Sequence, residues 1–248
     1  MSLCANPTWA ILKREWKAYF NSPVAYVFIV IFLVLAGFFT FNVSRLYEAG
    51  RADLGPFFFW HPWLYLILVP AVAMRLWAEE RRTGTLELLL TMPVTTTQAI
   101  VGKFAAAWLF LLLALALTFP VVITVAYLGQ PDAGPIVSGY AGSALLAGAY
   151  LAVGTFTSAL TRNQVVSFIL SAVIGLFLLL AGYPPVTDML AALAPSWVVE
   201  VVSGFSFSYH YEQLQRGVID LRDVLYFASV IGFMLLATQV TLENRKSR

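Results

Sequence analysis

Charged residues and cysteine are scarce in this sequence. Only 11% of its 248 residues are charged and 60% are apolar, whereas soluble domains carry about 25% charged and about 45–50% apolar residues. These proportions exclude a water-soluble fold, and they exclude a disordered chain, which is poor in apolar residues. The single cysteine, Cys4, excludes an internal disulfide framework and a four-thiolate metal site. The composition therefore predicts an integral membrane protein.

Motifs for chemistry within the chain are absent as well. The sequence has no His-Glu-x-x-His zinc pair and no Gly-x-Ser-x-Gly elbow, and Gly102-Lys103 is followed by Phe104 instead of the Ser or Thr of a phosphate-binding loop. His61 and His210 each stand beside aromatic residues and are interpreted as hydrogen-bonding side chains. The net charge of +2 does not favour a nucleic-acid partner. We therefore predict no catalytic residue, metal site or bound cofactor in this chain.

Long charge-free intervals predict the membrane spans. A spanning helix needs roughly 20 residues without unpaired charge, and the sequence contains six charge-free intervals of at least nineteen residues. Glycines in the fourth interval, Gly142, Gly148 and Gly154, predict close helix packing there. The prediction is an all-α integral membrane protein with one domain, 1–248. Its spans are expected at about 24–43, 57–77, 96–128, 140–160, 165–181 and 221–242.

The distribution of Lys and Arg predicts the orientation. With six spans, both termini lie on one side of the membrane, and that side collects eleven of the fifteen basic residues. Because cytoplasmic loops are enriched in Lys and Arg, both termini are expected in the cytoplasm. The eleven residues are Lys13, Arg14, Lys17, Arg75, Arg81, Arg82, Lys103, Arg162, Arg245, Lys246 and Arg248.

The segment before the first span, residues 8–20, is amphipathic. Trp9 and Trp16 recur at helical spacing with other apolar residues, while Lys13, Arg14 and Lys17 occupy the other face. This pattern is typical of a helix lying in the plane of the lipid headgroups. The alternative is a positively charged flank that only sets the topology.

The predicted cytoplasmic loop, 78–103, contains clear local signals. Gly84-Thr85 interrupts the chain, about two helical turns follow over 86–92, and Pro93 stops them. Thr95 and Gln98 have the spacing of a capping box that opens the third span. A short helix with several leucines needs the bilayer surface or a protein partner, although the loop could also merely cap the second span and anchor the third.

On the opposite side, residues 183–220 are apolar but interrupted by prolines. Two stretches, 189–199 and 201–208, are too short to span and are expected to dip partly into the outer leaflet. Asp220 is expected to cap the sixth span, with Asp223 in its first turn.

Two motifs resemble a known family. The run 79–89, EERRTGTLELL, followed by Met92-Pro93-Val94, resembles the signature of type-2 ATP-binding cassette exporter permeases. Residues 209–212, YHYE, and 216–224, RGVIDLRDV, are similar to the gliding-motility-associated permease subfamily. The six spans, the in-plane helix and the dipping outer segments agree with this class over essentially the whole chain.

The resemblance implies a set of partners. A short coupling helix, here about 84–92, would sit in a groove of a separate cytoplasmic ATP-binding cassette ATPase, which binds ATP and Mg. A second permease copy, identical or related, would complete the pathway in the bacterial inner membrane, and subfamily members commonly work with a membrane protein that has a large extracytoplasmic domain. The residues implied in ATPase coupling are Glu79, Glu80, Arg81, Gly84, Thr85, Leu86, Glu87, Leu88, Met92 and Pro93. The residues considered for outer partner contacts are Tyr209, His210, Glu212 and Arg216.

Two functional hypotheses follow. The first is the permease subunit of an ATP-driven exporter, which couples ATP hydrolysis by the separate ATPase to substrate translocation. The alternative is a membrane anchor that transmits mechanical work to a periplasmic partner without transporting substrate. An ion-coupled secondary transporter is disfavoured, because such proteins carry an ionisable residue within a span and the sequence shows no acidic residue in the middle of one.

Overall fold

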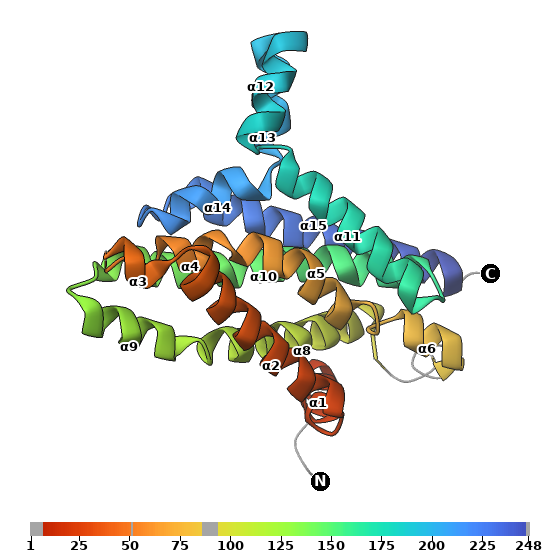
Figure 1. The fold of residues 1–248 in the computed structure, drawn as a ribbon. Helices are drawn as coiled ribbons and strands as arrows, with labels where there is room; N and C mark the ends of the chain where they lie inside the picture. Colours follow the sequence, from red (N-terminus) through yellow and green to blue (C-terminus); the bar gives the residue numbers. More distant parts are fainter. Residues whose placement is uncertain (1–6, 51, 86–93, 247–248) are drawn as a thin grey trace.

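The computed structural model describes residues 7–50, 52–85 and 94–246, and within these ranges the chain is helical without a β-strand. Figure 1 shows a bundle of long helices with α6 and the C-terminus at one end, and α3 and the α9–α10 turn at the other. The helices are α1 (Pro7–Phe20), α2 (Pro23–Phe38), which continues as a π-helical turn (Phe39–Val43), α3 (Leu46–Ala49), α4 (Gly55–Phe59), α5 (His61–Ala73), α6 (Ala78–Thr83), α8 (Thr96–Ala116), α9 (Phe119–Leu128), α10 (Ala133–Leu160), α11 (Gln164–Leu180), α12 (Pro184–Leu193), α13 (Ser196–Gly204), α14 (Phe207–Gln215) and α15 (Leu221–Lys246).

Local capping interactions set several helix starts. The Ser22 side chain accepts a hydrogen bond from the Val24 amide, and Pro23 occupies the first turn of α2, where its missing N–H costs nothing. The predicted Thr95–Gln98 capping box is confirmed, because each side chain accepts a hydrogen bond from the other residue's amide, at 3.1 and 3.2 Å. These starts depend on residues close in sequence, which explains why they could be predicted.

Four helical stretches of the described residues are long and apolar enough to cross a membrane: Pro23–Glu48, Thr96–Leu128, Ala133–Leu160 and Leu221–Asn244. A fifth span results if α11 and α12, which meet at an angle of 70°, are counted together. The structure thus supports four to five candidate spans, and the predicted count of six is not confirmed. The first, third, fourth and sixth predicted spans each overlap one of the four stretches.

The predicted second span, 57–77, differs most from expectation because it is not a single helix. The chain restarts at His61-Pro62, and α5 has only 13 residues with Pro70 inside it. After α5 the chain makes a turn, and the Ser158 hydroxyl of α10 accepts hydrogen bonds from the Trp77 and Ala78 amides, both at 3.0 Å. These contacts from a distant helix separate α5 from α6.

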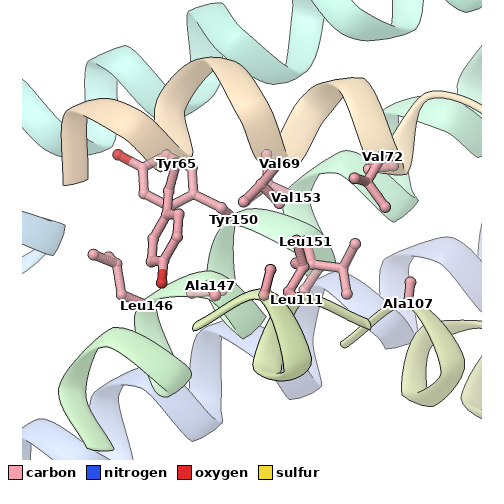
Figure 2. Packing of buried hydrophobic residues seen from close by; sticks show 14 of the residues in the cluster. Tyr65, Val69, Val72, Ala107, Leu111, Leu146, Ala147, Tyr150, Leu151 and Val153 are labelled. Atoms are coloured by element: carbon pink, nitrogen blue, oxygen red, sulfur yellow. The ribbon is translucent and has the colours of Figure 1, made fainter. Parts of the chain in front are cut away.

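Helix α10 lies at the centre of the bundle and packs against α5, α8, α11, α14 and α15. Figure 2 shows Tyr65 and Val69 of α5 and Leu111 of α8 facing Tyr150 and Leu151 of α10. Small residues permit this close packing, as predicted. A Cβ atom added at Gly154 would lie 2.3 Å from the Cβ of Ala73 on α5, so these helices approach nearly to backbone contact.

The predicted outer segments form two helices, α12 and α13, which project from one side of the bundle (Figure 1). Neither helix has a buried residue, and Leu193 and Trp197 are exposed. Their bounds differ from the predicted 189–199 and 201–208, because Pro184 begins the first helix and Pro195 separates it from the second. Helix α14 returns to the bundle and packs against α10.

The close packing at Gly154 predicts that a larger residue there lowers the stability of the protein. Replacing Gly154 with Ala forces α5 and α10 apart, and overpacking of this kind costs about 1–3 kcal/mol. The matched control is Gly37→Ala in α2, where an added Cβ meets nothing within 4 Å and the free energy of unfolding should change little or rise. Thermal unfolding of the purified proteins in detergent measures both effects. Equal stability of the two variants would contradict the close approach of α5 and α10.

Candidate functional site

The N-terminal helix lies directly on α8. At Gly102 an added Cβ would be 2.9 Å from the Ile11 side chain and 3.0 Å from the Thr8 carbonyl oxygen, so glycine allows α1 to touch the α8 backbone. The Tyr19 ring at the other end of α1 stacks on Phe110 of α8 with a centroid distance of 4.9 Å. Helix α1 is therefore packed against α8 along most of its length.

The faces of α1 agree in part with the predicted amphipathic pattern. Lys13, Arg14 and Lys17 are exposed, and Trp16 is partly buried against the core. The Trp9 side chain is 61% exposed. The structure contains no lipid, so the in-plane position of α1 stays a prediction.

A buried ammonium group connects α1, α6 and α8. The Lys103 side chain on α8 is 3% exposed, and its Nζ lies 3.1 Å from Glu15 Oε1 on α1 and 2.7 Å from Glu80 Oε1 on α6. The same Nζ lies 5.5 Å from the centroid of the Trp77 ring, within reach of a cation–π interaction. We call Glu15, Glu80 and Lys103 the ion cluster. The Arg14 guanidinium, whose Nη2 lies 2.8 Å from Glu15 Oε1, adds a second cation beside the two carboxylates.

The ion cluster changes the acidity of Glu15. Burial raises the pKa of this carboxyl group, but the Lys103 ammonium and the Arg14 guanidinium, 2.8 Å away, outweigh burial. The pKa of Glu15 is therefore lowered from its ordinary value of 4.5. The ionised carboxylate is the form that the folded protein stabilises.

Helix α6 is also connected to the central helix. The Ser158 hydroxyl of α10 accepts hydrogen bonds from the two backbone amides at the start of α6. It also donates a hydrogen bond to the Met74 carbonyl oxygen at 3.0 Å. Arg81 Nη1 donates to the Ala159 carbonyl oxygen at 2.8 Å. The helix ends at Gly84, whose φ of +73° is left-handed, a conformation that favours glycine. The segment that leads into the predicted coupling helix is thus held by α8 and α10.

The predicted ATPase-coupling residues fall into two groups. Glu79, Glu80 and Arg81 lie in α6, and Gly84 and Thr85 follow it. The other five lie outside the described residues, so the structure does not test them. They are Leu86, Glu87, Leu88, Met92 and Pro93.

Sequence reasoning did not assign Glu15 or Lys103 to a site. The signal for Lys103 was present, because it is the charged residue inside the predicted third span, and an ionisable residue in a span needs a partner. Its partners could not be identified from the sequence, because Glu15 is 88 residues away.

The predicted outer contact residues do not share one environment. Tyr209 is exposed, and Glu212 and Arg216 form an exposed ion pair one helical turn apart. His210 is buried instead. Its Nδ1 lies 2.7 Å from Asp223 Oδ1 and its Nε2 lies 3.1 Å from the Gly204 carbonyl oxygen. Within this chain His210 therefore connects α14 to α15, and the outer partner contact stays a prediction.

The buried histidine also changes the interpretation of the sixth span's first turn. Asp220 caps α15 as predicted, since its carboxylate accepts from the Arg222 amide at 2.9 Å. Asp223 does more than complement the helix start, because its carboxylate ties α15 to α14 through His210. Among the described residues, no group of three or more His, Cys, Asp or Glu side chains is arranged to hold a metal ion.

Comparison with known families identifies the class of this protein. Residues 64–242 match the domain described as ABC-2 family transporter protein. The match covers more than half of the chain, so the protein belongs to this family. It is a membrane permease component of an ABC transporter, the kind of subunit that works with an ABC ATPase. No curated protein matches the sequence significantly.

Removing the Lys103 charge tests the ion cluster. Lys103→Met leaves the Glu80 carboxylate without its ion-pair partner and leaves Glu15 paired with Arg14 only, and breaking a buried pair in this way costs about 3–5 kcal/mol. The triple variant Lys103→Met, Glu15→Gln, Glu80→Gln removes all three charges and should recover most of the lost stability. The free energy of unfolding in detergent provides the comparison. A stable single variant, or a triple variant no better than the single one, would show that the cluster does not hold α1 to α6.

The lowered pKa of Glu15 predicts a pH dependence. Because the folded-state pKa lies below the ordinary value of 4.5, the ion pair contributes its full stabilisation above that value and loses it as the pH falls through the folded-state pKa. The melting temperature of Glu15→Gln should therefore fall less than that of the wild type between about pH 5 and about pH 3. Glu48→Gln, which alters an exposed ion pair, serves as the control and should follow the wild type.

Proposed function

We propose that this chain is the permease subunit of an ATP-driven exporter, with residues 84–92 forming the coupling helix that docks in the separate ATPase. The observation that carries the proposal is the ion cluster. It joins α6, the last described helix before this segment, to α1 and to the start of α8. A displacement of the coupling helix by the ATPase would therefore move three elements together.

The contacts of α6 with α10 support the same proposal. Ser158 and Ala159 hold the start and the middle of α6 through three hydrogen bonds, from Trp77, Ala78 and Arg81. Ser158 also donates to the Met74 carbonyl oxygen at the end of α5. Since α10 is the central helix of the bundle, these contacts provide a short path from the loop to the core. Rigid packed elements with such hydrogen bonds can carry energetic coupling between distant sites.

We further propose the membrane arrangement that the resemblance implies. The chain would cross the bacterial inner membrane six times with both termini in the cytoplasm, the second span being the interrupted segment α4–α5. Large apolar side chains on α2 and α11, among them Val30 and Phe177, are exposed and suit contact with lipid or with a second permease copy.

Membership of the gliding-motility-associated subfamily is part of the proposal, with Tyr209, Glu212 and Arg216 as contacts for an extracytoplasmic partner.

Copurification with the cognate ATPase tests the proposal. Gly84→Pro should reduce the recovered ATPase at least about tenfold, a loss of about 1.4 kcal/mol in binding. The reason is that proline is restricted to φ near −65°, whereas Gly84 has φ +73°. Glu87→Arg, which reverses a charge within the proposed coupling helix, should have the same effect.

The control for the copurification is Gly50→Pro. Gly50 also has a left-handed φ, +58°, but it follows α3 at the opposite end of the bundle (Figure 1). This variant should bind the ATPase like the wild type. If Gly84→Pro and Glu87→Arg insert normally into the membrane and still bind the ATPase, the loop is only a structural connection. That result would contradict the coupling helix on which the exporter proposal depends.

A further inference from the structure

Helices α12 and α13, which we call the hairpin, stand on the bundle with both ends at its base (Figure 1). Gly182 precedes the hairpin and Ser206 follows it, and a Cβ atom added at Gly182 would lie 2.6 Å from the Ser206 Cβ. Neither helix of the hairpin has a buried residue. The contacts at the base therefore decide how the hairpin stands on the bundle.

Two neighbouring helices contact the last turn of the hairpin at this base. The Tyr226 hydroxyl of α15 donates a hydrogen bond to the Phe205 carbonyl oxygen. His210 of α14 places its Nε2 3.1 Å from the carbonyl oxygen of Gly204, the last residue of α13. The His210 residue is 5% exposed, and its ring stacks on that of Tyr226 with a centroid distance of 3.9 Å.

The partners of His210 fix the number of protons that this site holds. A carbonyl oxygen only accepts hydrogen bonds, so Nε2 must donate to Gly204. Nδ1 lies 2.7 Å from Asp223 Oδ1, and a hydrogen bond there needs a second proton, either on the imidazole or on the carboxyl group. In both cases the pair of His210 and Asp223 holds one proton more than a neutral imidazole beside an ionised carboxylate.

Loss of that extra proton leaves one of the two hydrogen bonds of His210 unmade. The remaining N–H is drawn to the Asp223 carboxylate, because a hydrogen bond to a charged acceptor is roughly twice as strong as one between neutral groups. Nε2 then presents a lone pair to the Gly204 carbonyl oxygen, and two acceptors repel each other. The bond that opens is therefore the one that holds the end of α13.

Asp223 is the ionised group that faces His210 in the described part of the chain. The other rings in contact are those of Tyr226 and, at a centroid distance of 5.3 Å, Tyr209, and phenols stay neutral up to about pH 10. Helices α4, α10 and α11, which also pack against α14, contain no charged residue. The other charged residues of α13, α14 and the start of α15 are exposed: Glu200, Glu212, Arg216, Asp220 and Arg222.

We infer that His210 and Asp223 form a proton-dependent latch for the hairpin. With the extra proton bound, His210 joins α14, α15 and Gly204, and the hairpin is fixed as the structure shows it. Without the proton the contact with Gly204 opens, and the hairpin moves relative to the bundle. The inference goes beyond the proposed function, because the latch needs neither the ATPase nor a transported substrate.

A distance between two spin labels tests the latch. The full chain with Cys4→Ser, Leu193→Cys and Tyr127→Cys carries one label on the hairpin and one on α9, at positions that are 77% and 92% exposed. Pulsed electron paramagnetic resonance in lipid nanodiscs gives the distance distribution at about pH 5.5 and about pH 9, on either side of the ordinary titration of histidine. We expect a narrow distribution at the lower pH and a broader, shifted one at the higher pH.

Asp223→Asn separates the proton from the contacts. An amide donates to Nδ1 while the neutral imidazole donates from Nε2 to Gly204, so both hydrogen bonds form without the extra proton. The distribution should therefore be narrow at both pH values. The matched control is Asp220→Asn, which alters an exposed carboxylate at the start of the same helix and should keep the pH response of the wild type.

His210→Phe removes the latch but keeps a ring beside Tyr226, and it should give the broad distribution at both pH values. Should this variant not fold, Asp223→Asn decides alone. The inference is overturned if the wild-type distribution is the same at both pH values. It is equally overturned if Asp223→Asn still responds to pH or is broad throughout, or if His210→Phe stays narrow. None of these measurements involves the ATPase, so the copurification separately decides the proposed function.

Discussion

The buried ammonium of Lys103 is the constraint that organises the part of this structure where α1, α6 and the start of α8 meet. An ammonium withdrawn from water must be paired, and its partners here are Glu15 of α1 and Glu80 of α6. Both carboxylates must remain close to α8 for the charge to be satisfied. The N-terminal helix, the segment before the predicted coupling helix and the start of α8 are therefore held as one unit.

The central helix α10 extends this unit into the bundle. Its small residues bring α5 to nearly backbone contact at Gly154, and one turn later Ser158 accepts the amides that open α6. Helix α10 therefore packs closely against α5 and also provides the hydrogen-bond acceptor for the amides at the start of α6. In a permease that works with an ATPase, this arrangement connects α6 to the helical bundle through a turn that Ser158 holds at both ends.

Sequence reasoning succeeded where the physical cause is local and failed where it is not. The Thr95–Gln98 capping box, the Asp220 cap and the helix at the N-terminus follow from residues a few positions apart, and the structure contains all three. The predicted second span extended to residue 77, but the chain turns after Ala73, and Ser158, 81 residues from Trp77, accepts hydrogen bonds from the amides that begin α6. His210 was interpreted as a hydrogen-bonding side chain, and it has two partners, but only the structure identifies them as Asp223 and the Gly204 carbonyl oxygen.

The sequence by itself determined that this protein is an all-helical membrane permease, because apolar composition, long charge-free intervals and the EERRTGTLELL motif are properties of the chain read in order. The family match over residues 64–242 agrees with that conclusion. Tertiary structure alone decided which charges meet. Lys103 could have paired with any carboxylate near the same membrane surface, and only the packing of α1 on Gly102 and of α6 on Ser158 brings Glu15 and Glu80 to it. That packing also leaves a cavity of about 560 Å³, which Glu15, Glu80 and Lys103 help to line and which no local pattern encodes.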